Sequence, residues 1–117
     1  MKYEDLRKRT KEYALQIIRL YTSLPNRSEH QILGKQLLRS GTSVGTQYRE
    51  GFRAKSNADY INKLQGALQE LEESMYWLEL LHDITLPLQD VITALMNESN
   101  ELIAILTTLV KNKRALP

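Results

Sequence analysis

Four stretches of apolar residues, recurring at intervals of three and four, constrain the fold of this chain more than any other sequence feature. An α-helix turns once in about 3.6 residues, so this spacing gathers the apolar side chains into one stripe per helix. The stripes predict helices at residues 3–24, 29–53, 57–82 and 88–112. Short connections make sequential helices antiparallel neighbours. The sequence therefore predicts an all-α fold, an up-and-down antiparallel four-helix bundle about 30 Å long, in one domain that spans residues 1–117.

Proline and small polar residues separate these helices. Pro25 follows the first helix, and Pro87 suits the first turn of the fourth. We expect Asn26 or Ser28 to cap the second helix. Ser56, with an acidic residue three positions later, resembles a capping box at the start of the third.

The second predicted helix contains three glycines, Gly34, Gly41 and Gly45. Each costs a helix about 1 kcal/mol relative to alanine. We nevertheless expect a continuous helix, because the apolar stripe keeps its phase across the glycines, and we expect these small residues to let a neighbouring helix approach closely. The alternative, a phosphate-cradling loop, lacks the GxxxxGK[ST] pattern and a preceding strand.

Composition excludes several kinds of site. The chain has no cysteine, so it holds neither a disulfide nor a thiolate metal site. No apolar run approaches the ~20 residues of a membrane span, and the N-terminus lacks the apolar stretch of a signal peptide. We therefore expect a cytoplasmic protein with no membrane partner.

No group of residues has the pattern of a catalytic or metal centre. Glu79 and His82 form one Glu-x-x-His motif, whereas bundles that hold two metal ions use two such motifs and two further glutamates. The only other histidine is His30. No spacing among serine, histidine and aspartate suggests a nucleophile. We therefore expect a protein that is not an enzyme and binds no metal or other cofactor.

The predicted topology sorts the charged residues by end of the bundle. The end that holds both chain termini carries 12 basic and 5 acidic residues, a formal charge of +7, with Arg9 among the basic ones. The other end carries 4 basic and 9 acidic residues, a formal charge of −5, with Glu98 and Glu101 among the acidic ones. A basic surface of this size suits the phosphates of a nucleic acid. The candidate nucleic-acid-binding residues are Arg7, Lys8, Lys11, Arg49, Arg53, Lys55, Lys63, Lys111, Lys113 and Arg114.

Two other interpretations of the basic end remain open. Basic residues near helix C-termini offset the helix dipole, and they can form a solvated face that binds nothing. The basic end of one subunit can also meet the acidic surface of another.

Three charged residues on the second and third helices are candidates for a structural polar cluster: Arg39, Glu50 and Glu70. Exposed surface charges are the alternative. Trp77 and the neighbouring Tyr76 lie off the main apolar stripe, and such an aromatic pair can line a subunit contact.

The run LLRSGTSVGTQYREGFR at residues 37–53, together with residues 59–64 and 67–73, resembles a known family. These are the bacterial four-helix-bundle proteins encoded in intervening sequences of 23S rRNA genes, which are related to the accessory variability protein of diversity-generating retroelements. The resemblance covers nearly the whole chain. Its most specific part is the Arg-Ser, Thr-Ser-Val and Glu-Gly motif within residues 39–51, where Gln47 replaces the usual asparagine.

This resemblance implies a helix across the glycines and a ring-shaped homopentamer. For the retroelement relative, it implies binding to nucleic acid and to a reverse transcriptase. It carries over no catalytic residue. We therefore expect a non-enzymatic oligomeric scaffold that binds nucleic acid, with RNA as the first candidate ligand and DNA as the second. The alternative is a protein-interaction adaptor that docks a partner polypeptide, such as a reverse transcriptase, without binding nucleic acid.

Overall fold

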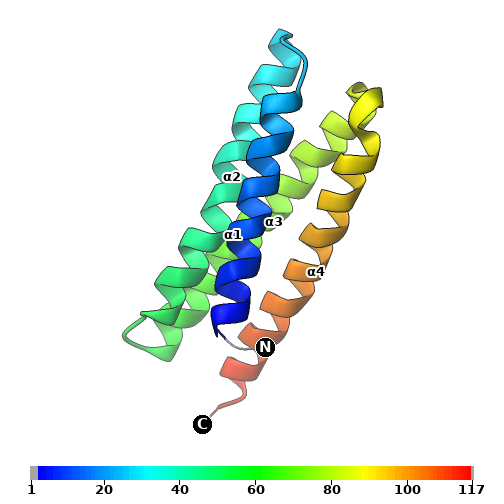
Figure 1. Ribbon diagram of the computed structural model, residues 1–117. Helices are drawn as coiled ribbons and strands as arrows, with labels where there is room; N and C mark the ends of the chain where they lie inside the picture. The colour runs from blue at the N-terminus through cyan, green and yellow to red at the C-terminus, as the bar shows by residue number, and fades with distance from the viewer. Residues whose placement is uncertain (1–2, 117) are drawn as a thin grey trace.

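The computed structural model describes residues 3–116, which form four long helices joined by short connections (Figure 1). They are α1 (Tyr3–Ser23), α2 (Ser28–Phe52), α3 (Asn57–Ile84) and α4 (Gln89–Arg114), with one turn of 3₁₀-helix, η1 (Leu86–Leu88), before α4. Sequential helices pack against each other, and the described residues contain no strand. The predicted all-α, up-and-down antiparallel four-helix bundle is confirmed.

The bundle measures 51 × 21 × 20 Å along its principal axes, so it is longer than predicted. One reason is helix length, since the 28 residues of α3 span about 42 Å at 1.5 Å per residue. The other is stagger. The end of α4 extends beyond the start of α1 at the bottom of Figure 1, and α1 and α2 extend beyond α3 and α4 at the top.

The helix bounds lie within two residues of those predicted, and one of the two predicted caps is present. The Oγ of Ser56 accepts a hydrogen bond of 3.1 Å from the backbone N–H of Asp59. The predicted cap of α2 was wrong. Arg27 occupies the N-cap position without a capping side chain, and its guanidinium instead pairs with Glu29.

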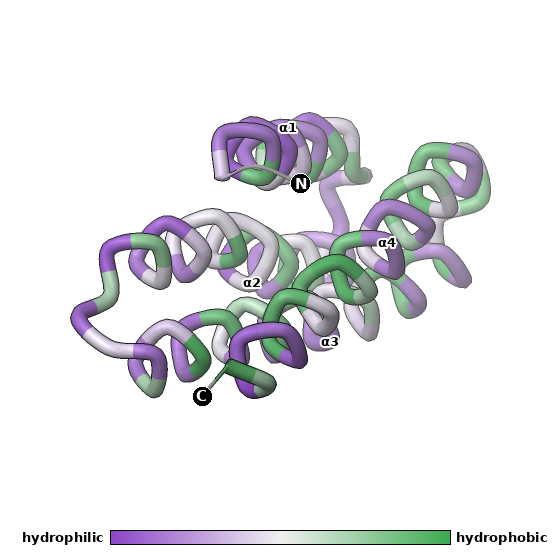
Figure 2. Tube along the Cα trace, turned by 90° about the horizontal axis from the view of Figure 1, so that it is seen from below, coloured by the Kyte–Doolittle hydropathy of each residue, from purple (hydrophilic) through white to green (hydrophobic). Residues whose placement is uncertain are grey.

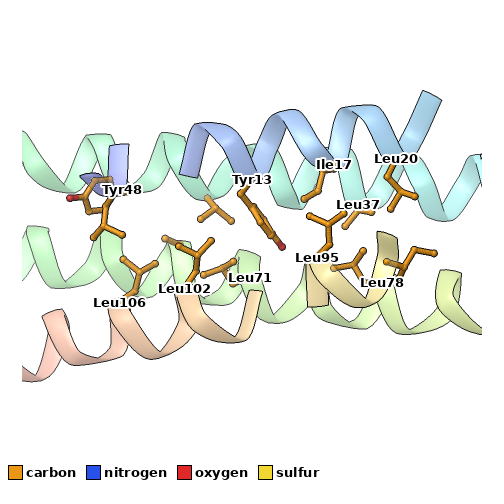
Figure 3. Close-up of a cluster of buried hydrophobic side chains, with 14 of the residues drawn as sticks. Tyr13, Ile17, Leu20, Leu37, Tyr48, Leu71, Leu78, Leu95, Leu102 and Leu106 are labelled. Atoms are coloured by element: carbon orange, nitrogen blue, oxygen red, sulfur yellow. The ribbon is translucent and has the colours of Figure 1, made fainter. Parts of the chain in front are cut away.

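A single apolar core runs along the bundle and receives side chains from all four helices (Figure 3). The buried positions of each helix recur at intervals of three and four, as the stripes predict. On α3 they are Leu64, Ala67, Leu71, Ser74, Leu78 and Leu81. Figure 2 views the bundle along its length and shows the hydrophilic segments that alternate with apolar ones around each helix.

Buried hydroxyl groups interrupt this core near its middle. The Oγ atoms of Ser40 on α2 and Ser74 on α3 lie 2.7 Å apart. The phenol of Tyr13 on α1 lies 2.6 Å from Ser99 Oγ on α4. All four residues are fully buried or nearly so. Because a buried polar group is costly unless it is paired, these two contacts favour one alignment of the helices.

The glycines of α2 let α1 approach closely. A Cβ atom on Gly41 would clash with Cδ1 of Ile17, and one on Gly34 would lie only 2.7 Å from Cδ1 of Tyr21. The helix continues through all three glycines, and no described glycine has a positive φ. The structure therefore confirms the continuous helix and the close helix approach, and it contradicts the phosphate-cradling loop.

Candidate nucleic-acid interface

The antiparallel topology brings the candidate basic residues to one end of the bundle, at the bottom of Figure 1 and facing the viewer in Figure 2. The start of α1, the turn between α2 and α3, and the end of α4 meet there. We name this surface the basic end. Its members are Arg7, Lys8, Lys11, Arg49, Arg53, Lys55, Lys63, Lys111, Lys113 and Arg114.

Two members of the basic end form ion pairs with nearby glutamates. Nη1 of Arg7 lies 2.9 Å from Oε1 of Glu4, one turn earlier on α1. Nζ of Lys63 on α3 lies 3.5 Å from Oε1 of Glu50 on α2. Ion pairs exposed to this degree contribute little to stability, so both cations remain accessible to an anion from solution.

Seven members have no side-chain hydrogen bond or ion pair within residues 3–116. All but the half-buried Arg49 are exposed. The seven are Lys8, Lys11, Arg49, Arg53, Lys55, Lys111 and Arg114. Positive charges gathered on one surface repel one another and attract anions, and salt screens both effects.

Pairs of basic side chains line two of the hollows at the basic end. Lys11 and Arg49 line a shallow one that crosses α1 and α2. Lys55 and Lys113 line a larger pocket of about 460 Å³, where the α2–α3 turn meets the start of α1 and the end of α4. The fold thus brings Lys11 beside Arg49, and Lys55 beside Lys113.

The larger pocket contains four aromatic side chains, and we name it the aromatic pocket. The Tyr3 ring stacks on Phe52, with 3.7 Å between ring centroids, and on Tyr48, with 5.4 Å between centroids. The fourth ring is Tyr60, and Nζ of Lys113 lies 5.0 Å from its centroid, a cation–π contact.

Sequence reasoning missed this aromatic group. A signal was present, because Tyr48 and Phe52 are four residues apart near the end of one helix, whereas Tyr3 and Tyr60 lie near the starts of two others. In an antiparallel bundle those positions meet at the same end.

Arg9 does not belong to the basic end, contrary to the sequence-based division of charge. Its Nε and Nη2 atoms each lie 2.7 Å from a carboxylate oxygen of Glu98 on α4. Nη2 also lies 3.3 Å from Glu101. The hydrogen bond with Glu98 raises the pKa of Arg9 further above its usual value. Because α4 extends beyond the start of α1, these acids lie beside Arg9 and not at the far end, and the predicted charge separation was too large.

Comparison with known proteins identifies the family. The sequence profile of the 23S rRNA-intervening sequence protein matches residues 4–108. This chain belongs to the 23S rRNA intervening sequence protein family. The resemblance of the run at residues 37–53 is thereby confirmed.

A solved structure agrees with this membership. A protein of unknown function from the S23 ribosomal protein family of Bacteroides thetaiotaomicron shares 39% sequence identity with this chain, with a TM-score of 0.86. The match covers 95% of this chain and 99% of the other. A search of curated proteins found no match.

Arg39 and Ser40, at the start of the motif within residues 39–51, lie at the contact between α2 and α3. Arg39 donates hydrogen bonds to Glu70 at 3.2 Å and to Glu73 at 2.5 Å. The hydrogen bond from Arg39 lowers the pKa of the Glu73 carboxyl, which also accepts a bond from Trp77 Nε1. The next motif residue, Ser40, bonds to α3 within the core. Arg39 and Ser40 therefore join α2 to α3.

Glu50 does not join this cluster. It lies three helical turns beyond Arg39 on α2, too far to share its partners, and it pairs with Lys63 instead. Sequence reasoning missed Glu73, although that residue is one turn from Glu70 and so lies on the same face of α3.

Neither a metal centre nor a membrane span occurs within residues 3–116. No three His, Cys, Asp or Glu side chains gather there in a way that could hold a metal ion. His82 pairs with the adjacent Asp83, and the buried His30 has its Nε2 3.2 Å from the carbonyl oxygen of Ile84. No helix in this part of the chain is long and apolar enough to cross a membrane.

Proposed function

We propose that this protein is a non-enzymatic, oligomeric scaffold that acts in the cytoplasm and binds RNA through its basic end. The observation that carries the proposal is the group of seven basic side chains without a partner among the described residues. Their charge is gathered at one end of a chain whose family is named for the 23S rRNA intervening sequence. RNA phosphates are anions that such a surface attracts, and their contacts need no particular base sequence.

Salt dependence tests the proposal. A short labelled RNA, followed by fluorescence anisotropy, should bind at low salt, and the logarithm of affinity should fall linearly with the logarithm of salt concentration. The variant Arg49→Glu/Arg53→Glu/Lys55→Glu should bind more weakly and with a shallower slope, because it loses phosphate contacts. Wild-type protein that retains no RNA at low salt would contradict the proposal.

A matched variant separates the basic end from net charge. Arg19→Glu/Arg27→Glu/Lys35→Glu changes net charge equally at the opposite end of the bundle. These three residues are exposed, and the ion pairs of Arg19 and Arg27 are surface pairs of low energy. This variant should bind nearly as tightly as wild type. An equal loss in both variants would mean that affinity follows total charge and not the basic end.

A protein-interaction adaptor is the second candidate. An apolar groove between α1 and α4 favours it, lined by residues that include Leu20, Leu88, Val91 and Leu95. Val91 is 49% exposed although it is apolar. Apolar grooves of this kind suit a partner polypeptide, such as a reverse transcriptase, or another copy of the chain in the homopentamer that the resemblance implies.

Two measurements distinguish these candidates: the mass of the protein in solution, and the nucleic acid or polypeptide that it retains. Analytical ultracentrifugation should give a pentamer, and Val91→Glu should dissociate it if the groove forms the subunit contact. Purified protein without nucleic acid, together with salt-insensitive retention of a partner polypeptide, would favour the adaptor over the RNA scaffold.

A further inference from the structure

We propose that the aromatic pocket holds one unpaired nucleobase of a single-stranded RNA, with Lys55 and Lys113 at the flanking phosphates. This inference rests on the proposed function. It adds that the basic end takes unpaired RNA in preference to a duplex.

The aromatic stack of the pocket runs from the core to the surface. Tyr48 and Phe52 both stack on the Tyr3 ring. Tyr48 is 5% exposed, whereas Phe52 is 58% exposed. Phe52 is the only phenylalanine of the chain. The Phe52 ring is supported by Tyr3, which in turn stacks on Tyr48, and it remains open to solvent, so it is a platform on which a base can stack.

The supporting rings hold this platform in place. Tyr48 donates a hydrogen bond of 3.3 Å to the backbone oxygen of Tyr3, which fixes the start of α1 against α2. Tyr60 and Leu109 complete the wall from α3 and α4. Residues from all four helices, together with the α2–α3 turn that carries Lys55, therefore line the pocket.

Size and charge suit a nucleotide. The volume of about 460 Å³ falls within the roughly 300–1,000 Å³ of small-ligand pockets. Lys55 is exposed and has no partner within the described residues, and the Lys113 ammonium lies over the Tyr60 ring. Aromatic rings bordered by lysines are the combination that binds single strands, because the rings take the bases and the cations follow the backbone.

Duplex RNA does not meet these requirements. Its bases stack on one another, and its deep, narrow major groove keeps side chains away from the base edges. A duplex can therefore use the lysines and arginines of the basic end, but it cannot use the Phe52 ring. Preference for unpaired RNA is the property that separates the pocket from the charged surface around it.

The test uses an oligouridine that contains one 2-aminopurine, a base whose fluorescence falls when it stacks. Wild-type protein should quench this fluorescence on binding. Phe52→Leu keeps an apolar side chain but removes the ring. It should bind the oligomer about tenfold more weakly, with little quenching. Its affinity for duplex RNA and its salt dependence should match those of wild type, since every charge remains.

Ile32→Ala is the control on the same helix. Ile32 is an apolar side chain that is 64% exposed, and it lies on α2, about 30 Å along the helix from Phe52 at 1.5 Å per residue. Its removal should change neither affinity nor quenching.

Three results would overturn the inference and leave the proposed function standing. They are binding without quenching by wild type, unchanged affinity of Phe52→Leu for the unpaired oligomer, and an equal loss for duplex RNA. Absence of all RNA binding would overturn both proposals.

A second variant keeps the inference testable if circular dichroism shows that Phe52→Leu does not fold. Phe52→Trp keeps an aromatic ring in the stack and supplies a new fluorophore, whose emission must change on addition of oligouridine. Unchanged emission would overturn the inference.

Discussion

The phenolic oxygen of Tyr13 lies 2.6 Å from the hydroxyl oxygen of Ser99, within an otherwise apolar core. The two residues belong to α1 and α4, the first and last helices, which touch at fewer places than any two consecutive helices among the four long ones. Ser99 Oγ also donates to the backbone oxygen of Leu95 at 2.8 Å. Ser99 is therefore the acceptor when Tyr13 donates, and the pair joins the neighbouring long helices that pack together most sparsely.

Tyr13→Phe should lower the free energy of unfolding by about 1 kcal/mol, the usual net value of one hydrogen bond. The ring remains to fill the core, and the hydroxyl of Ser99 keeps its bond to Leu95. Urea denaturation at fixed protein concentration measures the loss. A double-mutant cycle with Ser99→Ala isolates the pair, and a coupling energy near zero would contradict its role.

Arg9→Ala should destabilise the fold by about 1 kcal/mol at low salt, because it leaves the carboxylate of Glu98 without its bidentate partner. The Arg9 and Glu98 side chains are only 28% and 23% exposed, so salt screens this pair less than a surface pair. Arg19→Ala is the control on the same helix. Its ion pair with Glu12 is exposed, and its removal should have almost no effect on thermal unfolding. Equal effects of the two variants would show that burial of the Arg9 pair does not matter.

Gly41→Ala should destabilise the protein on the order of 1 kcal/mol, even though alanine favours helix by about 1 kcal/mol. The added methyl group would clash with the fully buried Ile17, and overpacking of a core typically costs about 1–3 kcal/mol. Gly66→Ala should do the opposite. Its methyl group would meet the end of Gln47, a flexible side chain at a half-buried position that can move aside. Thermal unfolding of both variants decides the matter, and stabilisation by Gly41→Ala would show that α1 and α2 can separate at little cost.

Stability should decline at alkaline pH partly through Tyr48. Burial, with nearby Tyr60 and Tyr3 adding to it, raises the pKa of this phenol to about 12. In the unfolded chain the value is about 10, so between these pH values the folded protein holds the proton more tightly. The contribution of Tyr48 is therefore complete below about pH 10 and is lost as pH rises through about 12. Tyr48→Phe should flatten this decline in urea-unfolding experiments across the alkaline range. An unchanged slope would mean that the phenol titrates at its ordinary pKa.

The parts of the fold that local chemistry decides could be predicted from the sequence. Helix periodicity and the capping hydroxyl of Ser56 depend on residues within one or two turns, so a short stretch of sequence predicts them. The unbroken α2 is an intermediate case. The phase of its apolar stripe predicts a helix across Gly41, but only the position of Ile17 on the neighbouring helix shows why glycine is needed there.

Features that depend on the register between distant helices could not be predicted. Counting along the chain placed Arg9 and Glu98 at opposite ends, whereas the stagger of α1 against α4 makes them partners. The stagger depends on how the side chains of whole helix faces pack together, and no short sequence motif predicts it. The aromatic pocket is missed for a related reason, since the rings of Tyr3, Phe52 and Tyr60 come from three helices and meet only when the bundle closes.

The sparse contact between α1 and α4 also has a consequence for motion. Glycine packing holds α1 closely against α2, while polar bonds at Tyr13 and Arg9 are among its few ties to α4. The smallest partial opening of this fold is therefore separation of the first and last helices along their shared seam. In native-state hydrogen exchange, amides of α1 and α4 that face this seam should exchange through a subglobal opening. The contact between α2 and α3 should retain protection up to the global free energy of unfolding.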